Sequence, residues 1–221
     1  MPAASAGALV LALGLGTVAY GLTPDGEPVR IAYTGPDAAP PTHGPPAADP
    51  TGTGGTTGTT GTGSAPEAGW TASPPVRLLI PRIGVDAPVG PVGLNGDGTV
   101  EVPPLDRPDR VGWYRDSAAP GLPGPAVLLG HYRTRKGAAV FLQLPKLRPG
   151  DTVQVRREDG RTVSYRVRAI RQFAKSAFPT ELVYGATADA QLRLVTCGGT
   201  IGHDGHYSDN IVVLADLADG P

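Results

Sequence analysis

The chain has 221 residues, with 19 Lys and Arg against 20 Asp and Glu, and a formal net charge of -1 at pH 7. Nucleic-acid surfaces need a basic excess, so this balance argues against nucleic acid as a partner. A single cysteine excludes an intrachain disulfide. The sequence has neither cysteine pairs for a structural metal nor a phosphate-binding glycine loop ahead of a helix, so we expect no metal and no cofactor.

The first 22 residues form an apolar segment, with no charged residue between Pro2 and Leu22. A helix of about 20 residues spans ~30 Å, the thickness of a bilayer core. The segment predicts a single-pass N-terminal membrane anchor that holds the rest of the chain outside the cell membrane. A cleaved signal segment is the alternative, although Ala3-Ala4-Ser5-Ala6 comes too early to be its cleavage site.

Residues 23–75 are of low complexity. They contain the pairs Pro40-Pro41 and Pro45-Pro46 and a run of Gly and Thr from Thr51 to Gly63. Such a composition buries too little apolar surface to offset the entropy lost on ordering. We predict a disordered tether that holds a folded domain away from the membrane.

The folded domain is predicted over residues 76–217, with a short tail over 218–221. Its pattern is strand-like almost throughout, and turns separate the strands. The predicted strands are 76–80, 98–102, 111–115, 126–129, 151–157, 161–173, 192–197 and 210–217. Asp159-Gly160 is the strongest hairpin signal, and one short helix-like piece covers 138–144. Strands with so little helix indicate an all-β closed barrel or sandwich, and we predict a β-barrel with one or two short helices.

The only cysteine, Cys197, lies at the end of a predicted strand. Alternation places it on the face opposite Leu192 and Leu194. The strand stops at Gly198-Gly199, and glycine lets another chain approach closely. A thiol in this position is a candidate nucleophile, whereas the simpler interpretation is a small buried apolar residue.

His131 also ends a predicted strand, after the apolar run 126–129 and Gly130. A thiolate with a nearby imidazole satisfies the logic of nucleophilic catalysis, provided that both strand ends lie at the same rim of the barrel. A metal site built from His203, Asp204 and His206 with Cys197 is the competing arrangement. We disfavour it because tightly spaced ligands on rigid elements are missing.

Several ordered motifs resemble the sortases, the cysteine transpeptidases of Gram-positive cell surfaces. Leu194-Val195-Thr196-Cys197 is similar to the family's Leu-x-Thr-Cys motif, and Gly130-His131 matches its catalytic histidine in order and spacing. The wider pattern resembles the actinobacterial class F group. The segments that carry it are Gly112-Trp113-Tyr114, Gly124-Pro125-Ala126-Val127, Phe178-Pro179-Thr180, Val183-Tyr184-Gly185 and Thr196-Cys197-Gly198-Gly199. The resemblance covers residues 76–217.

The resemblance implies an eight-stranded barrel and a two-step acyl transfer that anchors surface proteins to the cell wall. Cys197 would attack the Thr-Gly bond of a Leu-Pro-x-Thr-Gly sorting signal on a secreted protein and form a thioester. An amine of a peptidoglycan precursor would then take the acyl group, with His131 as general acid and then general base. The loop between Phe173 and Gln191 corresponds to the one that shapes the family's sorting-signal groove, although its Phe178 and Tyr184 are equally suited to the core.

One departure concerns the arginine that the family carries on its last strand, because this chain has no arginine or lysine after Arg193. Asn210 is the leading substitute as an oxyanion-binding or substrate-positioning donor. Thr196 is a second candidate, and Arg133 and Arg115 are fallback donors. The missing arginine supports an alternative function, a sortase-like barrel that binds sorting signals or wall peptides with little or no turnover. A thiol hydrolase, in which water resolves the thioester, is the third possibility.

Overall fold

The computed structural model of the chain describes residues 72–218. The predicted membrane anchor, the tether up to residue 71 and residues 219–221 lie outside this range. Within the described range, none of the helices has the length and apolar character needed to cross a membrane.

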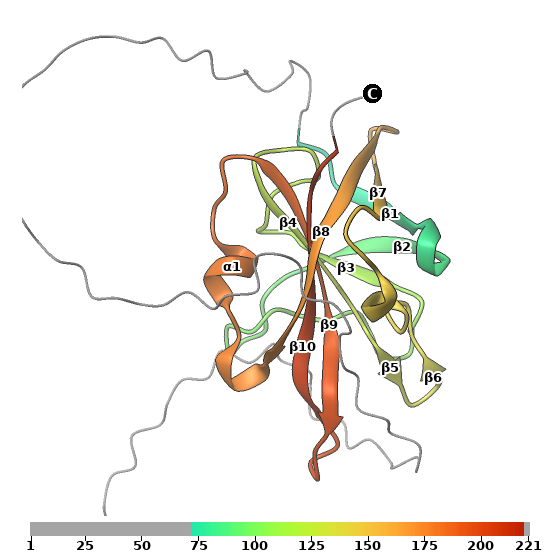
Figure 1. Cartoon of the computed structure of the whole chain (residues 1–221), viewed down its shortest axis with the longest axis vertical. Coiled ribbons are helices and arrows are strands. Elements are labelled where there is room, and N and C mark those ends of the chain that lie inside the picture. The colour runs from blue at the N-terminus through green and yellow to red at the C-terminus, as the bar shows by residue number, and fades with distance from the viewer. Residues whose placement is uncertain (1–71, 219–221) are drawn as a thin grey trace, which may run out of the picture.

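Eight strands within residues 72–218 close into a barrel in the order β1-β2-β3-β4-β9-β10-β8-β7 (Figure 1). These are β1 (Pro75–Ile80), β2 (Val85–Val92), β3 (Val111–Tyr114), β4 (Gly124–Gly130), β7 (Thr152–Arg157), β8 (Thr162–Ala174), β9 (Ala190–Ile201) and β10 (Tyr207–Leu217). A separate hairpin is formed by β5 (Arg133–Thr134) and β6 (Gly137–Ala138). Helical structure in the described range is limited to α1 (Thr180–Tyr184) and the 3-10 turns η1 (Pro81–Ile83), η2 (Leu144–Lys146) and η3 (Lys175–Ala177). The predicted closed, eight-stranded, all-β barrel is confirmed.

One barrel strand differs from the prediction. The predicted strand 98–102 is reduced to a single bridge between Leu94 and Val100, and β2 has no counterpart among the predicted strands. Pro88 and Pro91 lie within β2, and proline weakens a strand signal because it cannot donate a ladder hydrogen bond. β2 forms because it has partners on both sides, β1 in antiparallel and β3 in parallel register. That pairing is long-range and leaves no local signal.

The helix predicted over 138–144 is wrong, because this stretch continues from β6 through a turn into η2. Its later N–H groups donate to carbonyls three residues earlier, from Leu142 to Ala139 and from Leu144 to Phe141, both at 3.0 Å. These are the bonds of turns and 3-10 structure, not the i→i−4 bonds of an α-helix. The N–H groups of Val140 and Phe141 donate to the distant carbonyls of Pro108 and His131. The segment therefore fixes the chain that follows β4 instead of forming a helix.

Strand alternation sorts the apolar residues into two layers. The inner cluster fills the barrel and includes Leu192 and Leu194 of β9. The outer cluster includes Val195 of β9 and Val183 of α1, so α1 covers part of the outer face of the barrel. Because Cys197 alternates with Val195, it belongs to the outer face.

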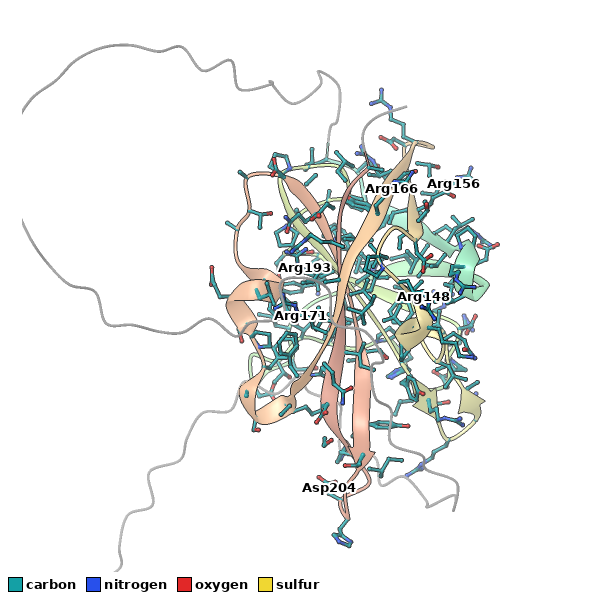
Figure 2. All side chains as sticks on the ribbon, in the orientation of Figure 1. Arg148, Arg156, Arg166, Arg171, Arg193 and Asp204 are labelled. Atoms are coloured by element: carbon teal, nitrogen blue, oxygen red, sulfur yellow. The ribbon has the colours of Figure 1, made fainter. Side chains whose placement is uncertain are left out.

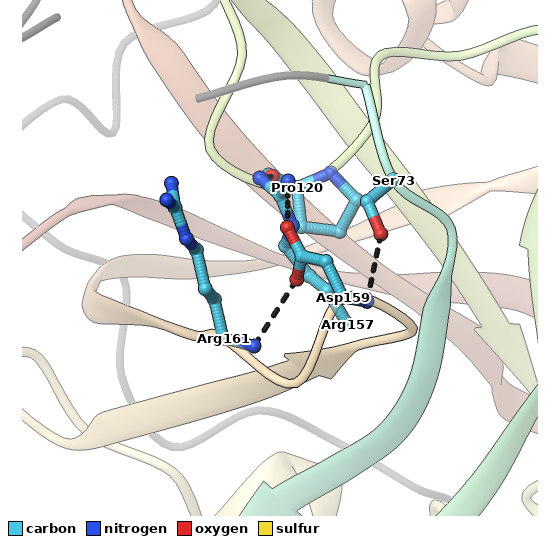
Figure 3. Close-up of polar contacts among 5 residues, drawn as sticks. All are labelled: Ser73, Pro120, Arg157, Asp159 and Arg161. Atoms are coloured by element: carbon cyan, nitrogen blue, oxygen red, sulfur yellow. Dashed lines mark hydrogen bonds and ion pairs between the residues drawn. The ribbon is translucent and has the colours of Figure 1, made fainter. Parts of the chain in front are cut away.

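The barrel end remote from Cys197 is held by Arg157, which is only 1% exposed. Its Nη1 donates to the carbonyl of Pro120 at 3.0 Å, and its Nη2 pairs with the carboxylate of Asp159 at 2.6 Å (Figure 3). The N–H of Asp159 donates to Ser73 Oγ at 3.1 Å, which ties the segment before β1 to the β7–β8 hairpin. These contacts anchor one end of the barrel, and the candidate site lies at the other.

Candidate active site

The parallel strands β4 and β9 bring His131 and Cys197 to the same rim of the barrel. Their register pairs Leu129 with Val195, so His131 and Cys197 each come two residues after a paired position. This register places two residues 66 positions apart at the same level of neighbouring strands. His131 directly follows β4, as expected, but Cys197 does not end its strand, because β9 continues to Ile201.

Thr196 links β9 to the end of β4 on the inner face of the barrel. Its hydroxyl donates to the carbonyl of Gly130 at 2.8 Å, and its side chain is 3% exposed. Alternation points Thr196 away from Cys197 and into the barrel. Its hydroxyl therefore fixes the backbone immediately before His131.

Two glycines permit the close packing around this rim. A Cβ on Gly130 would lie 2.5 Å from the ring of Phe141, so only glycine leaves room for that ring against β4. Gly199 has φ +80°, and a Cβ there would lie 2.3 Å from Ser208 Oγ. Gly199, two residues after Cys197, thus allows β10 to approach closely at the register shift between Tyr207 and Asp209.

Cys197 is buried, with 9% of its surface exposed. Burial raises the pKa of its thiol to about 11, although the nearby positive charge of Lys175 acts in the opposite direction and lowers it. Desolvation disfavours the thiolate because the charged form loses its hydration. At neutral pH the thiol of Cys197 is therefore protonated.

His131 is also buried, at 3% exposed. Its Nε2 lies 2.7 Å from the carbonyl oxygen of Pro103. Because a carbonyl oxygen can only accept, Nε2 carries a proton and Nδ1 is the acceptor in the neutral ring. Burial lowers the pKa of His131, and the hydrogen bond to Pro103 only partly opposes this effect. The resting site thus holds a neutral thiol and a neutral imidazole.

Asn210 lies directly beside Cys197, because the two residues are register partners on β10 and β9. Its side chain is 2% exposed, and its Nδ2 has no hydrogen-bond partner among residues 72–218. An unsatisfied buried donor costs stability, so it has to be explained by something other than packing. Asn210 was expected to open its strand, but β10 begins earlier, at Tyr207. Asn210 is therefore a mid-strand residue and not part of a turn.

The cation nearest to the chemistry is Lys175, which the sequence argument did not identify. Arg115 lies beyond the end of β3 remote from His131, since Val111 at the other end of β3 pairs with Gly130. Arg133 is exposed on the β5–β6 hairpin. Lys175 begins η3 directly after β8, whose Phe173 pairs with Asn210. The only advance signal was its place in the loop assigned to the sorting-signal groove.

Aromatic residues of the connection between β8 and β9 lie on the outer face of the barrel, the face that also carries Cys197. The rings of Phe178 and Tyr184 lie 6.3 Å apart, and Tyr184 packs edge-on against Tyr114 at 5.9 Å. Both Phe178 and Tyr184 are half-buried against the outer cluster. They thus combine the two roles considered for them, because they cover core residues and also border the face that carries Cys197.

Arg193 joins this connection to the barrel. It is buried beside α1 (Figure 2), where its Nε donates to the carbonyl of Leu182 at 3.1 Å and its Nη2 donates to Gln191 Oε1. Arg193 and Cys197 share a strand face but are separated by about 13 Å along β9. Arg193 therefore positions α1 and does not reach the thiol.

The competing metal arrangement does not form. Among residues 72–218, no three His, Cys, Asp or Glu side chains converge as metal ligands. Asp204 lies at the tip of the β9–β10 hairpin (Figure 2), and its Oδ1 accepts from the N–H of His206 at 3.0 Å. Cys197 lies further back along β9, within the barrel wall.

Comparison with known proteins identifies the family of this chain. A sortase-domain family profile matches residues 78–218. Similar solved structures include Streptococcus agalactiae sortase C1 in complex with MTSET, at 22% identity and TM-score 0.52, covering 67% of this chain and 71% of that one. Sortase C-1 from Actinomyces oris is 24% identical with TM-score 0.52 and coverages of 65% and 73%. The lid mutant of sortase A from Corynebacterium diphtheriae is 21% identical with TM-score 0.53 and coverages of 68% and 74%. A search of curated proteins found no match.

Proposed function

Because the chain belongs to the sortase family, we propose that it is a cysteine transpeptidase for Leu-Pro-x-Thr-Gly-type sorting signals. The observation that carries this proposal is the parallel register of β4 and β9, which places Cys197 of β9 level with His131, the residue directly after β4. The hydrogen bond from Thr196 to Gly130 supports it by fixing the backbone immediately before His131.

In the first step, a proton moves from the Cys197 thiol to the His131 imidazole, and the thiolate attacks the carbonyl carbon of the signal's Thr. The C–N bond to Gly breaks, and the leaving amine takes the proton from His131. The product is a thioester on Cys197. Asn210 is the donor for the oxyanion, because its Nδ2 is buried beside Cys197 and unpartnered among the described residues.

In the second step, an acceptor amine attacks the thioester carbon and the C–S bond breaks. His131 takes the proton of the amine and returns one to the Cys197 sulfur, so the free thiol forms again. The Lys175 charge favours each state in which sulfur or the carbonyl oxygen is negative. It takes over part of the role that the family gives to an arginine on the last strand.

We further propose that the enzyme works on the outer side of the cell membrane, where the segment 1–22 anchors it and the stretch 23–71 extends it towards the wall; the predicted tether ends there, because Ser73 and Pro75 belong to the barrel. Its acceptor there is an amine of a peptidoglycan precursor. We propose that the chain is a class F sortase, and the sequence motifs given above support this.

The test is to incubate the purified full-length chain with a Leu-Pro-x-Thr-Gly peptide, with and without an amine, and to follow the products by mass spectrometry. A thioester adduct with a ligated product in the presence of amine supports the transpeptidase. A cleaved acid as the main product, even with excess amine, would identify a thiol hydrolase instead.

A binding barrel with little turnover is the second candidate, and one observation favours it. The pKa of Cys197 is raised to about 11, so only a small fraction of the thiol is ionised at neutral pH. Saturable peptide binding without any adduct in the same experiment would identify this function.

We expect Asn210→Leu to slow thioester formation by ~10²-fold, the usual loss on removing one oxyanion donor. Leucine has the same branched arrangement of heavy atoms as asparagine, although it is larger, and it cannot donate. Because the substitution also removes an unsatisfied buried amide, the thermal unfolding midpoint should stay equal or rise. Single-turnover thioester formation and a thermal melt of the full-length chain measure the two effects.

Lys175→Gln is the contrasting variant in this experiment. It removes the charge that lowers the Cys197 pKa, so both thioester formation and alkylation by iodoacetamide should slow. Asn210→Leu should slow thioester formation alone. Lys146→Gln, on the exposed turn η2, is the charge-matched control. An Asn210→Leu protein that forms the thioester at the parent rate contradicts the oxyanion role.

A further inference from the structure

A groove of about 370 Å³ lies between the end of β2, the loop 103–110 and the start of β3. Prolines form much of its wall, among them Pro91, Pro103 and Pro104. Its charged lining residues are Asp106, Arg107 and Arg110, which leaves an excess of one positive charge. The groove is therefore suited to a small ligand with an anionic group.

The two arginines of the groove have no partners of their own. Among residues 72–218, neither Arg107 nor Arg110 has a side-chain hydrogen bond or an ion pair, and Arg110 is half-buried. The planar guanidinium donates two parallel hydrogen bonds to a carboxylate. Lys136, whose Nζ donates to the carbonyl of Asp106 at 2.9 Å, adds a further positive charge nearby. A carboxylate is the ligand group that this arrangement fits.

The groove lies next to His131, on the side away from Cys197. Pro103, which lines the groove, is the residue whose carbonyl accepts from His131 Nε2 at 2.7 Å. Val111, another lining residue, pairs with Gly130 immediately before His131. In the barrel order β3-β4-β9, the strand β4 that leads to His131 stands between the groove on β3 and Cys197 on β9. A ligand held in the groove thus lies one strand away from Cys197, beside the residues that support His131.

We infer that this groove binds the carboxylate of the acceptor, so that the preferred acceptor is an amino acid or peptide with a free carboxylate near its amine. This inference rests on the proposed transpeptidase function. The amine nitrogen bonds to the thioester carbon, the C–S bond breaks, and the amine proton passes through His131 to the Cys197 sulfur. Binding of the carboxylate by Arg107 and Arg110 holds the acceptor next to the loop and strand that support His131, which raises its effective concentration at the site.

The experiment compares two acceptors, glycylglycine and glycylglycinamide, with the full-length chain and a sorting-signal peptide. The carboxylate is one residue away from the amine, so the two amines differ little in basicity. The parent protein should show a KM about tenfold lower for glycylglycine. In the Arg107→Gln/Arg110→Gln double variant that preference should disappear, and transfer to glycylglycinamide reports any general damage. Arg82→Gln, on the exposed turn η1 at the opposite end of β2, is the matched control and should keep the preference.

Binding alone separates failure of this inference from failure of the proposed function. Isothermal titration of the full-length chain with each dipeptide requires no turnover. Tighter binding of glycylglycine that the double variant loses supports the groove even if no thioester ever forms. Equal affinity and equal KM for the two acceptors in the parent protein, or a preference retained in the double variant, would overturn the inference.

Discussion

Cys197→Ala is expected to abolish thioester formation and to lower peptide cleavage by roughly 10⁴-fold or more, because the chain has no other thiol to form the covalent intermediate. The chain contains a single cysteine, so the variant has no thiol at all. The full-length protein, mixed with a sorting-signal peptide and examined by intact mass, should show no adduct. Peptide cleavage should fall to the rate of the uncatalysed reaction.

The same variant should keep its fold. Cys197 is 9% exposed, and its replacement by alanine removes one sulfur atom, which costs about 1 kcal/mol in a typical core position. The thermal midpoint should therefore fall by only a few degrees. Cys197→Ser is the matched control, since it keeps the shape but offers a much weaker nucleophile. A folded Cys197→Ala protein that still cleaves the peptide would refute the enzyme hypothesis.

The sequence was sufficient to predict the barrel because most of its strands can be recognised from their local pattern of apolar and polar residues. β7 and β8 alternate apolar and polar residues on either side of the turn at Asp159, and β9 does so up to Cys197. β2 was not predictable in this way, because its strand character comes from pairing with β1 and β3. The stretch predicted as a helix over 138–144 forms turns that lead into the 3-10 turn η2, while the N–H groups of Val140 and Phe141 tie its start to distant parts of the chain.

In the candidate site too, residues marked by a local pattern were predictable and those placed by long-range pairing were not. Cys197 and His131 could be recognised because each follows an apolar run, although β9 continues beyond Cys197 to Ile201. The parallel register of β4 and β9 places the two residues at the same level. Lys175 could not be recognised, because its proximity depends on β8 and β10 pairing in a register that no local pattern specifies. The sequence also did not reveal that both side chains are buried, and this burial determines their pKa values. It raises the pKa of Cys197 and lowers that of His131, so the two groups rest uncharged.

This neutral resting pair gives His131 a larger role than orientation. A thiol with a pKa of about 11 becomes nucleophilic at neutral pH only when a base takes its proton during the reaction. The imidazole is suited to this task because its lowered pKa keeps it unprotonated at pH 7. Above the pKa of the thiol, a base is no longer needed. The demand for His131 should therefore be greatest near neutral pH and should decrease as pH rises towards 11.

We accordingly expect His131→Gln to slow thioester formation by ~10³-fold at pH 7, within the usual range for losing a proton-transfer group. Glutamine can still donate to the carbonyl of Pro103, so a structural contribution of that hydrogen bond is retained. Single-turnover rates measured from pH 7 to pH 10 should show a gap between variant and parent that narrows as pH rises. His131→Ala should respond to added imidazole with a partial recovery of rate, which a purely structural role would not produce. A His131→Gln protein within about threefold of the parent at pH 7 would show that another group moves the proton.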